Sequence, residues 1–152
     1  MSIKFTSLYM KSDDKCNNNN ELSSIINLLL QFRTDIKMFH WQTESFAYHK
    51  ISDELLSSID DLSDQLVEAL SGVLNTRPLA LGRNPSGINF PKVNSSIIVK
   101  DINTDLFLNE LDRVTDVLRN ATSSFLKFSE IANIRDEILG AIDKAKYLMS
   151  FK

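Results

Sequence analysis

The positions of proline constrain this chain most, because a proline ends or kinks any helix that contains it. All three prolines, Pro78, Pro85 and Pro91, fall in one stretch, together with Gly82 and Gly87. The segments on either side contain no proline, so each can form long helices. The sequence therefore predicts two helical regions joined by one long connection over residues 75–103.

Outside that connection, apolar residues recur at steps of three and four, which is typical of amphipathic helices. The pattern predicts helices over residues 21–43, 46–74, 105–129 and 133–150. Asn20 is expected to cap the first helix, with Glu21 in its first turn, and Thr104 to cap the third. Short polar turns are expected at residues 43–45 and around Glu130.

The lengths of the connections predict the helix directions. A short turn makes the helices of each pair antiparallel, whereas a long crossover makes the second and third helices parallel. Among four-helix bundles, one long crossover is the ferritin-like arrangement. The predicted fold is therefore an all-α, ferritin-like four-helix bundle over residues 20–152, preceded by a tail or extension over residues 1–19. Ile97, Ile98 and Val99 are expected to anchor the crossover in the core.

Composition narrows the class of protein. The chain has 152 residues, of which 43% are hydrophobic, enough for one domain with a real core. Its net charge of −3 argues against binding to duplex DNA, and the lysines near the N-terminus are diluted by acids. No apolar run is long enough to span a membrane, and no signal-peptide core is present. With a single cysteine as well, we expect a cytoplasmic protein.

Both histidines of the chain, His40 and His49, stand beside its densest run of acids. On a helix, residues four apart are neighbours, and residues eleven apart lie on the same face. His49 and Asp53 are four apart, as are Asp64 and Glu68, and Asp53 and Asp64 are eleven apart. Imidazole and carboxylate groups at this spacing are natural metal ligands. The pattern therefore predicts two ligand pairs on one helix face.

One helix cannot bring both pairs to the same ion. The rise from Asp53 to Asp64 is ~16 Å, and metal ligands lie ~2.0–2.3 Å from their ion. Two copies of this helix, packed antiparallel about a two-fold axis, would place His49 and Asp53 opposite Asp64 and Glu68 of the other copy. Two equivalent sites would then form per dimer. His40 could add a third ligand from the first chain.

Other residues near these pairs have simpler interpretations. We expect Glu54, Asp60 and Asp61 to form a solvated face of the second helix. Phe39 and Trp41 are expected to be core residues rather than redox relays.

The string His40-Trp41, then His49, Asp53, Asp64 and Glu68, resembles the Dps-type mini-ferritins. Their pattern is a His-Trp ending the first helix and a His-x3-Asp-x10-Asp-x3-Glu run on the second. The Ile142-Asp143-Lys144 segment of the last helix is similar as well. The spacing of nine between His40 and His49 is shorter than is usual in that family, and Gln42 replaces its asparagine.

The resemblance implies a subunit of a hollow homo-oligomer, a dodecamer, with ferroxidase sites at its two-fold interfaces. His40, His49, Asp53, Asp64 and Glu68 would be the metal ligands. Iron(II) would be oxidised there by hydrogen peroxide or oxygen and stored as ferric mineral, which protects against oxidative damage. Two alternatives stay open: a structural ferritin-like shell or scaffold with little or no ferroxidase activity, and a two-fold module that binds another metal, such as zinc.

Overall fold

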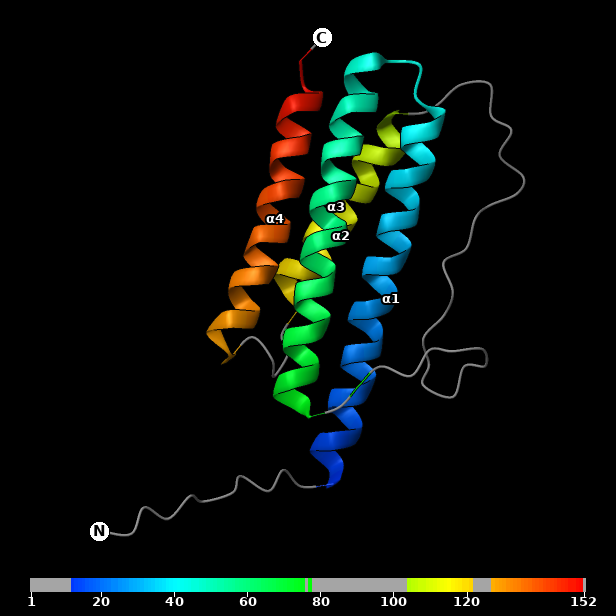
Figure 1. The fold of residues 1–152 in the computed structure, drawn as a ribbon. Helices are drawn as coiled ribbons and strands as arrows, with labels where there is room; N and C mark the ends of the chain where they lie inside the picture. The colour runs from blue at the N-terminus through cyan, green and yellow to red at the C-terminus, as the bar shows by residue number, and fades with distance from the viewer. Residues whose placement is uncertain (1–11, 76, 78–103, 122–126, 152) are drawn as a thin grey trace, which may run out of the picture.

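The computed structural model describes residues 12–75, 77, 104–121 and 127–151. Within these ranges the chain forms no strand and four helices: α1 (Ser12–Gln42), α2 (Phe46–Leu74), α3 (Thr104–Asn120) and α4 (Ser129–Met149). The helices lie side by side in one bundle (Figure 1). The all-α prediction is confirmed. The prolines of the long connection and its expected anchor at residues 97–99 lie outside the described residues.

The helices run in the directions that the connection lengths predict. A three-residue turn reverses the chain between α1 and α2, and α3 starts at the end of the bundle where α2 starts (Figure 1). Phe107, near the start of α3, stacks on Phe39, near the end of α1. The Tyr48 hydroxyl at the start of α2 donates to the carbonyl of Met149 at the end of α4, at 3.2 Å. Helices α2 and α3 are therefore parallel, and α4 runs back along both.

Helix α2 has the predicted bounds at both ends. It is capped by Ser45, whose extended backbone (φ −83°, ψ 119°) lets its side chain accept a hydrogen bond from the Tyr48 amide. At the other end Asn75 has φ 48° and ψ 48°, the left-handed conformation, and its amide reaches the carbonyls of Ser71 and Gly72. Asparagine is one of the few residues that adopt this conformation readily. The cap at Ser45 and the left-handed conformation of Asn75 thus define the two ends of α2.

Three other helix ends differ from the prediction by four residues or more, and Thr104 is the first residue of α3 rather than a cap before it. Helix α1 begins at Ser12, so Asn20 lies inside the helix and does not cap it. Asparagine is only a modestly poor helix former, so the polar run does not stop the helix. Helix α3 ends at Asn120, well before residue 129, and α4 begins at Ser129. Glu130 therefore lies in the first turn of α4, where an acid stabilises the helix dipole, and not in a turn between helices.

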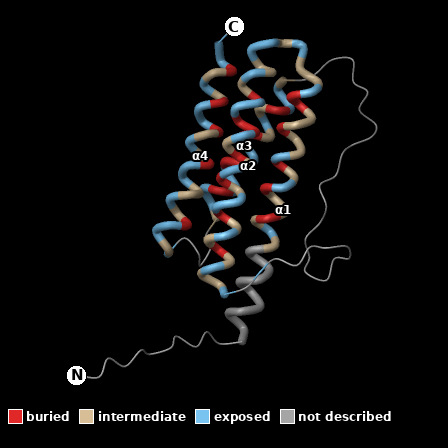
Figure 2. Tube along the Cα trace, in the orientation of Figure 1, coloured by how far each residue is buried: buried red, intermediate tan, exposed pale blue. Residues whose placement is uncertain are grey.

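The core lies along the centre of the bundle, where every helix turns its apolar stripe inward (Figure 2). Helix α2 packs mainly against α1 and α4, and α3 packs against the same two helices, so α2 and α3 lie on a diagonal. The most deeply buried side chains include Phe32, Ile36, Ile59, Leu70, Leu111, Val114, Ile138 and Ile142. None of the described helices is long and apolar enough to span a membrane.

The two aromatic residues predicted to lie in the core at the end of α1 differ in their exposure to solvent. Phe39 is buried, as expected, whereas 67% of Trp41 is exposed. The prediction for Trp41 is wrong because residues two apart on a helix point about 200° apart, so Phe39 faces the core and Trp41 faces outward. Lys37 lies over the Trp41 ring, 5.5 Å from its centroid.

Candidate metal centre

The two histidines meet at the turn between α1 and α2. His40 lies in the last turn of α1 and His49 in the first turn of α2. Their rings stack with centroids 3.8 Å apart and planes inclined by 24°. The Thr43 amide donates to the Phe39 carbonyl at 2.9 Å, which continues the helical hydrogen bonding into the turn. The short turn thus places the only two histidines of the chain against each other.

Crossed hydrogen bonds to the backbone orient both rings. Nδ1 of His40 lies 3.1 Å from the carbonyl oxygen of His49, and Nδ1 of His49 lies 3.0 Å from the carbonyl oxygen of His40. A carbonyl oxygen only accepts, so each Nδ1 must carry the proton. In a neutral imidazole, Nε2 then keeps the free lone pair. This is the arrangement of metal-binding histidines, which commonly donate their other nitrogen to a carbonyl.

Ser52 completes this network, and the sequence interpretation missed it. The residue is only 1% exposed, and its hydroxyl donates to the His49 carbonyl at 3.0 Å. The same oxygen lies 3.3 Å from Nδ1 of His40. A signal was present in the sequence, because Ser52 occupies a position of the apolar stripe that continues with Leu55, Leu56 and Ile59. A serine on such a stripe needs hydrogen-bond partners in the core.

The predicted carboxylate ligands lie exposed along α2. Among the described residues, Asp53, Asp64 and Glu68 have no ion pair and no side-chain hydrogen bond. By contrast, Glu54 pairs with Lys144 at 3.5 Å, and Asp60 pairs with Arg33. The three carboxylates are thus available to a cation, whereas two of their neighbours on α2 already have one.

The expected solvated face of α2 is confirmed. The Glu54 side chain is 67% exposed and that of Asp60 is 38% exposed. Asp61 is exposed as well. These acids meet solvent and surface cations, as acids on a long helix usually do.

A single chain does not gather the five predicted ligands. Within the described ranges, no three His, Cys, Asp or Glu side chains lie close enough together to hold a metal ion. The structure brings His40 and His49 together, and the rise along α2 separates them from Asp64 and Glu68. One chain therefore supplies a pair of imidazole rings at the α1–α2 turn and a row of exposed carboxylates farther along α2.

A charged cluster between α1 and α3 is separate from the histidines. Gln31 donates to Asp35 at 2.8 Å, and Arg113 donates twice to Glu110, at 2.8 and 2.6 Å. Burial raises the pKa of Asp35, although the hydrogen bond from Gln31 opposes this. The hydrogen bond to Glu110 raises the pKa of Arg113. This half-buried cluster bears on stability rather than on a metal site.

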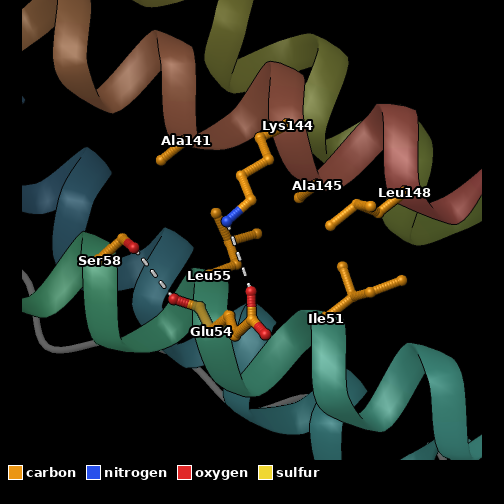
Figure 3. A pocket seen from close by; sticks show the side chains of 8 residues that line it. All are labelled: Ile51, Glu54, Leu55, Ser58, Ala141, Lys144, Ala145 and Leu148. Atoms are coloured by element: carbon orange, nitrogen blue, oxygen red, sulfur yellow. Dashed lines mark hydrogen bonds and ion pairs between the residues drawn. The ribbon is translucent and has the colours of Figure 1, made fainter.

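A small hollow lies between α2 and α4, and neither histidine lines it. Ile51, Leu55, Ala141 and Ala145 line it, and Lys144 reaches across its mouth to Glu54 (Figure 3). Its volume of about 30 Å³ is enough for a water molecule, but not for an organic substrate. The hollow follows from the two alanines, whose small side chains leave space beside α2.

Comparison with known proteins finds a match to a protein family. No curated protein and no solved structure matches the chain. The match is to a family of unknown function, DUF5856, and covers residues 40–149, from the first histidine to the last residue of α4. Since this is more than half of the sequence, the chain belongs to the DUF5856 family.

Proposed function

We propose that this protein oxidises and stores iron in the manner of the mini-ferritins, at metal centres that two copies of the chain build together. The observation that carries the proposal is the stacked pair of His40 and His49. Each ring is held through Nδ1 by the carbonyl of the other residue, which leaves Nε2 of both as a ligand.

The donor set fits iron(II). Imidazole nitrogen and carboxylate oxygen together suit iron in proteins. His40 and His49 supply nitrogen, and Asp53, Asp64 and Glu68 supply carboxylates that lack cationic partners among the described residues. All five lie inside the segment that matches the family.

Assembly about a two-fold axis would complete the centre. Helix α2 carries six acids and one lysine, so two antiparallel copies of α2 would repel each other unless cations lay between them. Iron bound between His49 and Asp53 of one copy and Asp64 and Glu68 of the other would supply that charge. The helix directions, with α2 parallel to α3 and one long connection between them, support a ferritin-like bundle. A homo-oligomer, with a dodecamer as the expected size, follows from the resemblance.

Iron(II) is the substrate of the proposed reaction. Two iron(II) ions each lose one electron, and one hydrogen peroxide takes both electrons and two protons to give two water molecules. The role of the histidines is to bind the metal with neutral nitrogen. The carboxylates add negative charge, which favours the more highly charged iron(III) product over iron(II).

The test is oxidation of iron(II) by the whole chain. Iron(II) is added without oxygen, peroxide follows, and the ferric absorbance is recorded. The protein should oxidise iron much faster than buffer alone, and His49→Ala and Asp53→Ala should lose the fast phase. Asp61→Ala is the matched control, because Asp61 is an exposed acid on the same helix outside the predicted ligand set. Rates that are the same in all four proteins would refute the proposal.

A second function, a shell or scaffold without catalysis, is supported by aromatic residues exposed at the histidine end of the bundle. Trp41 is 67% exposed, Phe46 75%, Tyr147 64% and Phe151 57%. Exposed aromatic residues in such number are typical of contact surfaces between proteins. Native mass measurement separates the two functions: a large oligomer that does not oxidise iron would favour the shell, and Phe46→Ser with Tyr147→Ser should then break it apart.

A further inference from the structure

We infer that the histidine end of the bundle is a second surface through which copies of this chain meet, and that this contact forms without metal. The inference rests on the proposed function for its purpose, the assembly of an oligomer larger than a dimer. The surface consists of four exposed aromatic side chains, called the aromatic band here: Trp41, Phe46, Tyr147 and Phe151.

A second surface is needed because the proposed metal centre can join only two copies. The outer face of α2 would meet the same face of one other copy about a two-fold axis. Such a contact is self-complementary, so it stops at a dimer. A hollow oligomer that stores mineral requires each dimer to meet others through a different part of the chain.

The aromatic band crosses three adjacent helices. Trp41 lies in the last turn of α1, Phe46 is the first residue of α2, and Tyr147 lies in the last turn of α4. Helix α2 packs against both α1 and α4, and these three helix ends lie together at one end of the bundle (Figure 1). Phe151 follows α4 and meets the Tyr147 ring edge to face, with centroids 4.9 Å apart. The described part of the chain exposes no other large aromatic side chain, so this exposure is confined to one end.

The apolar area of the band matches that of a protein interface. Between 57% and 75% of each of the four residues is exposed. An aromatic side chain offers ~150–250 Å², so the band exposes ~500 Å² of apolar surface. A standard interface buries ~800 Å² per partner, of which ~450 Å² is apolar. The band therefore supplies the apolar part of one such contact.

The charges beside the band favour another copy of the chain over an anionic membrane. Lys37 lies over the Trp41 ring and Lys50 over the Phe46 ring, 5.5 and 5.8 Å from the centroids. Lys146 is already paired with an acid of α3. Attachment to anionic lipid takes ~4–8 clustered cations. The two lysines over the rings are too few for that, but they suit the polar rim of a contact between proteins.

This contact does not require a metal ion. Helix α2 carries six acids, which repel a second copy of α2 until cations lie between them. The aromatic band brings neutral side chains together, and the burial of apolar surface drives their association. Removal of metal should therefore separate the α2 faces and leave the contact through the band intact.

Trp41 reports this contact directly, because it is the only tryptophan of the chain. The fluorescence of the metal-free, full-length protein is recorded in chelator over a dilution series, and native mass spectrometry gives the number of chains in the same samples. Association should shift the Trp41 emission to shorter wavelength and protect it from quenching by acrylamide. Both effects should disappear on dilution, over the range in which the mass falls to that of one chain.

Phe46→Ser combined with Tyr147→Ser tests the band by substitution. In chelator, this double variant should have the mass of one chain at concentrations at which the unaltered protein is associated. Leu30→Ser combined with Val117→Ser is the matched control, because these residues are 37% and 45% exposed and lie along α1 and α3, away from the histidine end. The control should associate as the unaltered protein does.

The outcomes separate this inference from the proposed function. When iron(II) is added, the double variant should form dimers; if it stays monomeric, the shared metal centre is refuted and the inference stands. The inference is overturned if the unaltered protein in chelator is a monomer throughout the dilution series. It is also overturned if Trp41 keeps the emission of an exposed indole in the oligomer, or if the double variant associates like the control. Sedimentation of a metal-free monomer with phosphatidylglycerol vesicles would assign the band to a membrane instead.

Discussion

Phe39 of α1 stacks face to face on Phe107 of α3, with ring centroids 4.0 Å apart and planes inclined by 5°. Both residues are buried, and Phe39 directly precedes His40. The stack therefore joins the start of α3 to the turn that carries the histidines. It is one of the packing contacts that fix the position of that turn.

Removing one ring of this stack should destabilise the bundle. Phe107→Ala should lower the free energy of unfolding by about 3–5 kcal/mol, because it leaves a cavity against Phe39. Urea denaturation followed by circular dichroism measures this. Leu106→Ala is the control: Leu106 is 66% exposed, and its loss should change stability by about 0.5 kcal/mol or less. Equal effects of the two substitutions would contradict the packing described here.

The carboxyl of Asp35 gives a prediction about pH. Burial between α1 and α3 raises its pKa above the ordinary value of 3.8, and repulsion by Glu110 acts in the same direction. A carboxyl with a raised pKa binds its proton more tightly in the folded state, so its contribution to stability is greatest below about pH 3.8 and is lost as the pH rises through the folded-state pKa. At neutral pH the charged form costs stability.

Asp35→Asn should therefore raise Tm at neutral pH, by a few degrees at most because the group is only half-buried. The amide can still accept the hydrogen bond from Gln31. The gain should shrink as the pH is lowered toward about 4. Thermal melts of both proteins across this range measure it. Asp116→Asn, at an exposed position of α3, should change Tm little at either pH. A gain that grows toward acid pH would show that the sign is wrong.

The proposed division of the metal centre between two chains predicts complementation. Asp53→Ala and Glu68→Ala should each fold and each lose fast iron oxidation, because each damages one side of every centre. A dimer of one Asp53→Ala chain and one Glu68→Ala chain has one centre in which all four ligands are intact. Its other centre lacks both carboxylates. Mixed dimers should therefore recover about half of the activity, as two-fold symmetry requires. If mass measurement shows that the mixed oligomers contain both variants and they still lack activity, a centre built from two chains is ruled out.

Binding to DNA should be absent at physiological salt. Attraction to phosphate depends on clustered cations, and this chain has a net charge of −3. A gel-shift titration with duplex DNA at about 150 mM salt should show free DNA at every protein concentration. A shifted band that disappears only at higher salt would show that a basic surface had been overlooked.

The sequence predicts most of the bundle because apolar spacing identifies helices and connection length identifies their directions. It predicts both ends of α2, where polar residues bound the apolar stripe. It misses the end of α3, since the apolar spacing continues through Ala121 while the helix stops at Asn120. The Asn120 side chain donates to the Asp116 carbonyl at 2.8 Å, a partner that apolar spacing does not reveal.

The candidate metal centre, too, can be predicted from the sequence only in part. A short turn between two helices is enough to predict that His40 and His49 come close together. Their crossed hydrogen bonds depend on where the turn places two carbonyl oxygens, which residue spacing does not specify. Ser52 could have been found, because it is a polar residue in the apolar register of α2.

The hydrogen bond from Tyr48 to the Met149 carbonyl has a practical consequence for the design of expression vectors. It holds the end of α4 beside the residue that precedes His49. A polyhistidine tag fused after α4 would therefore add foreign imidazoles next to the native pair and compete for the metal that we propose binds there. Helix α1 begins at the opposite end of the bundle from the histidines, ~45 Å away along its 31 residues.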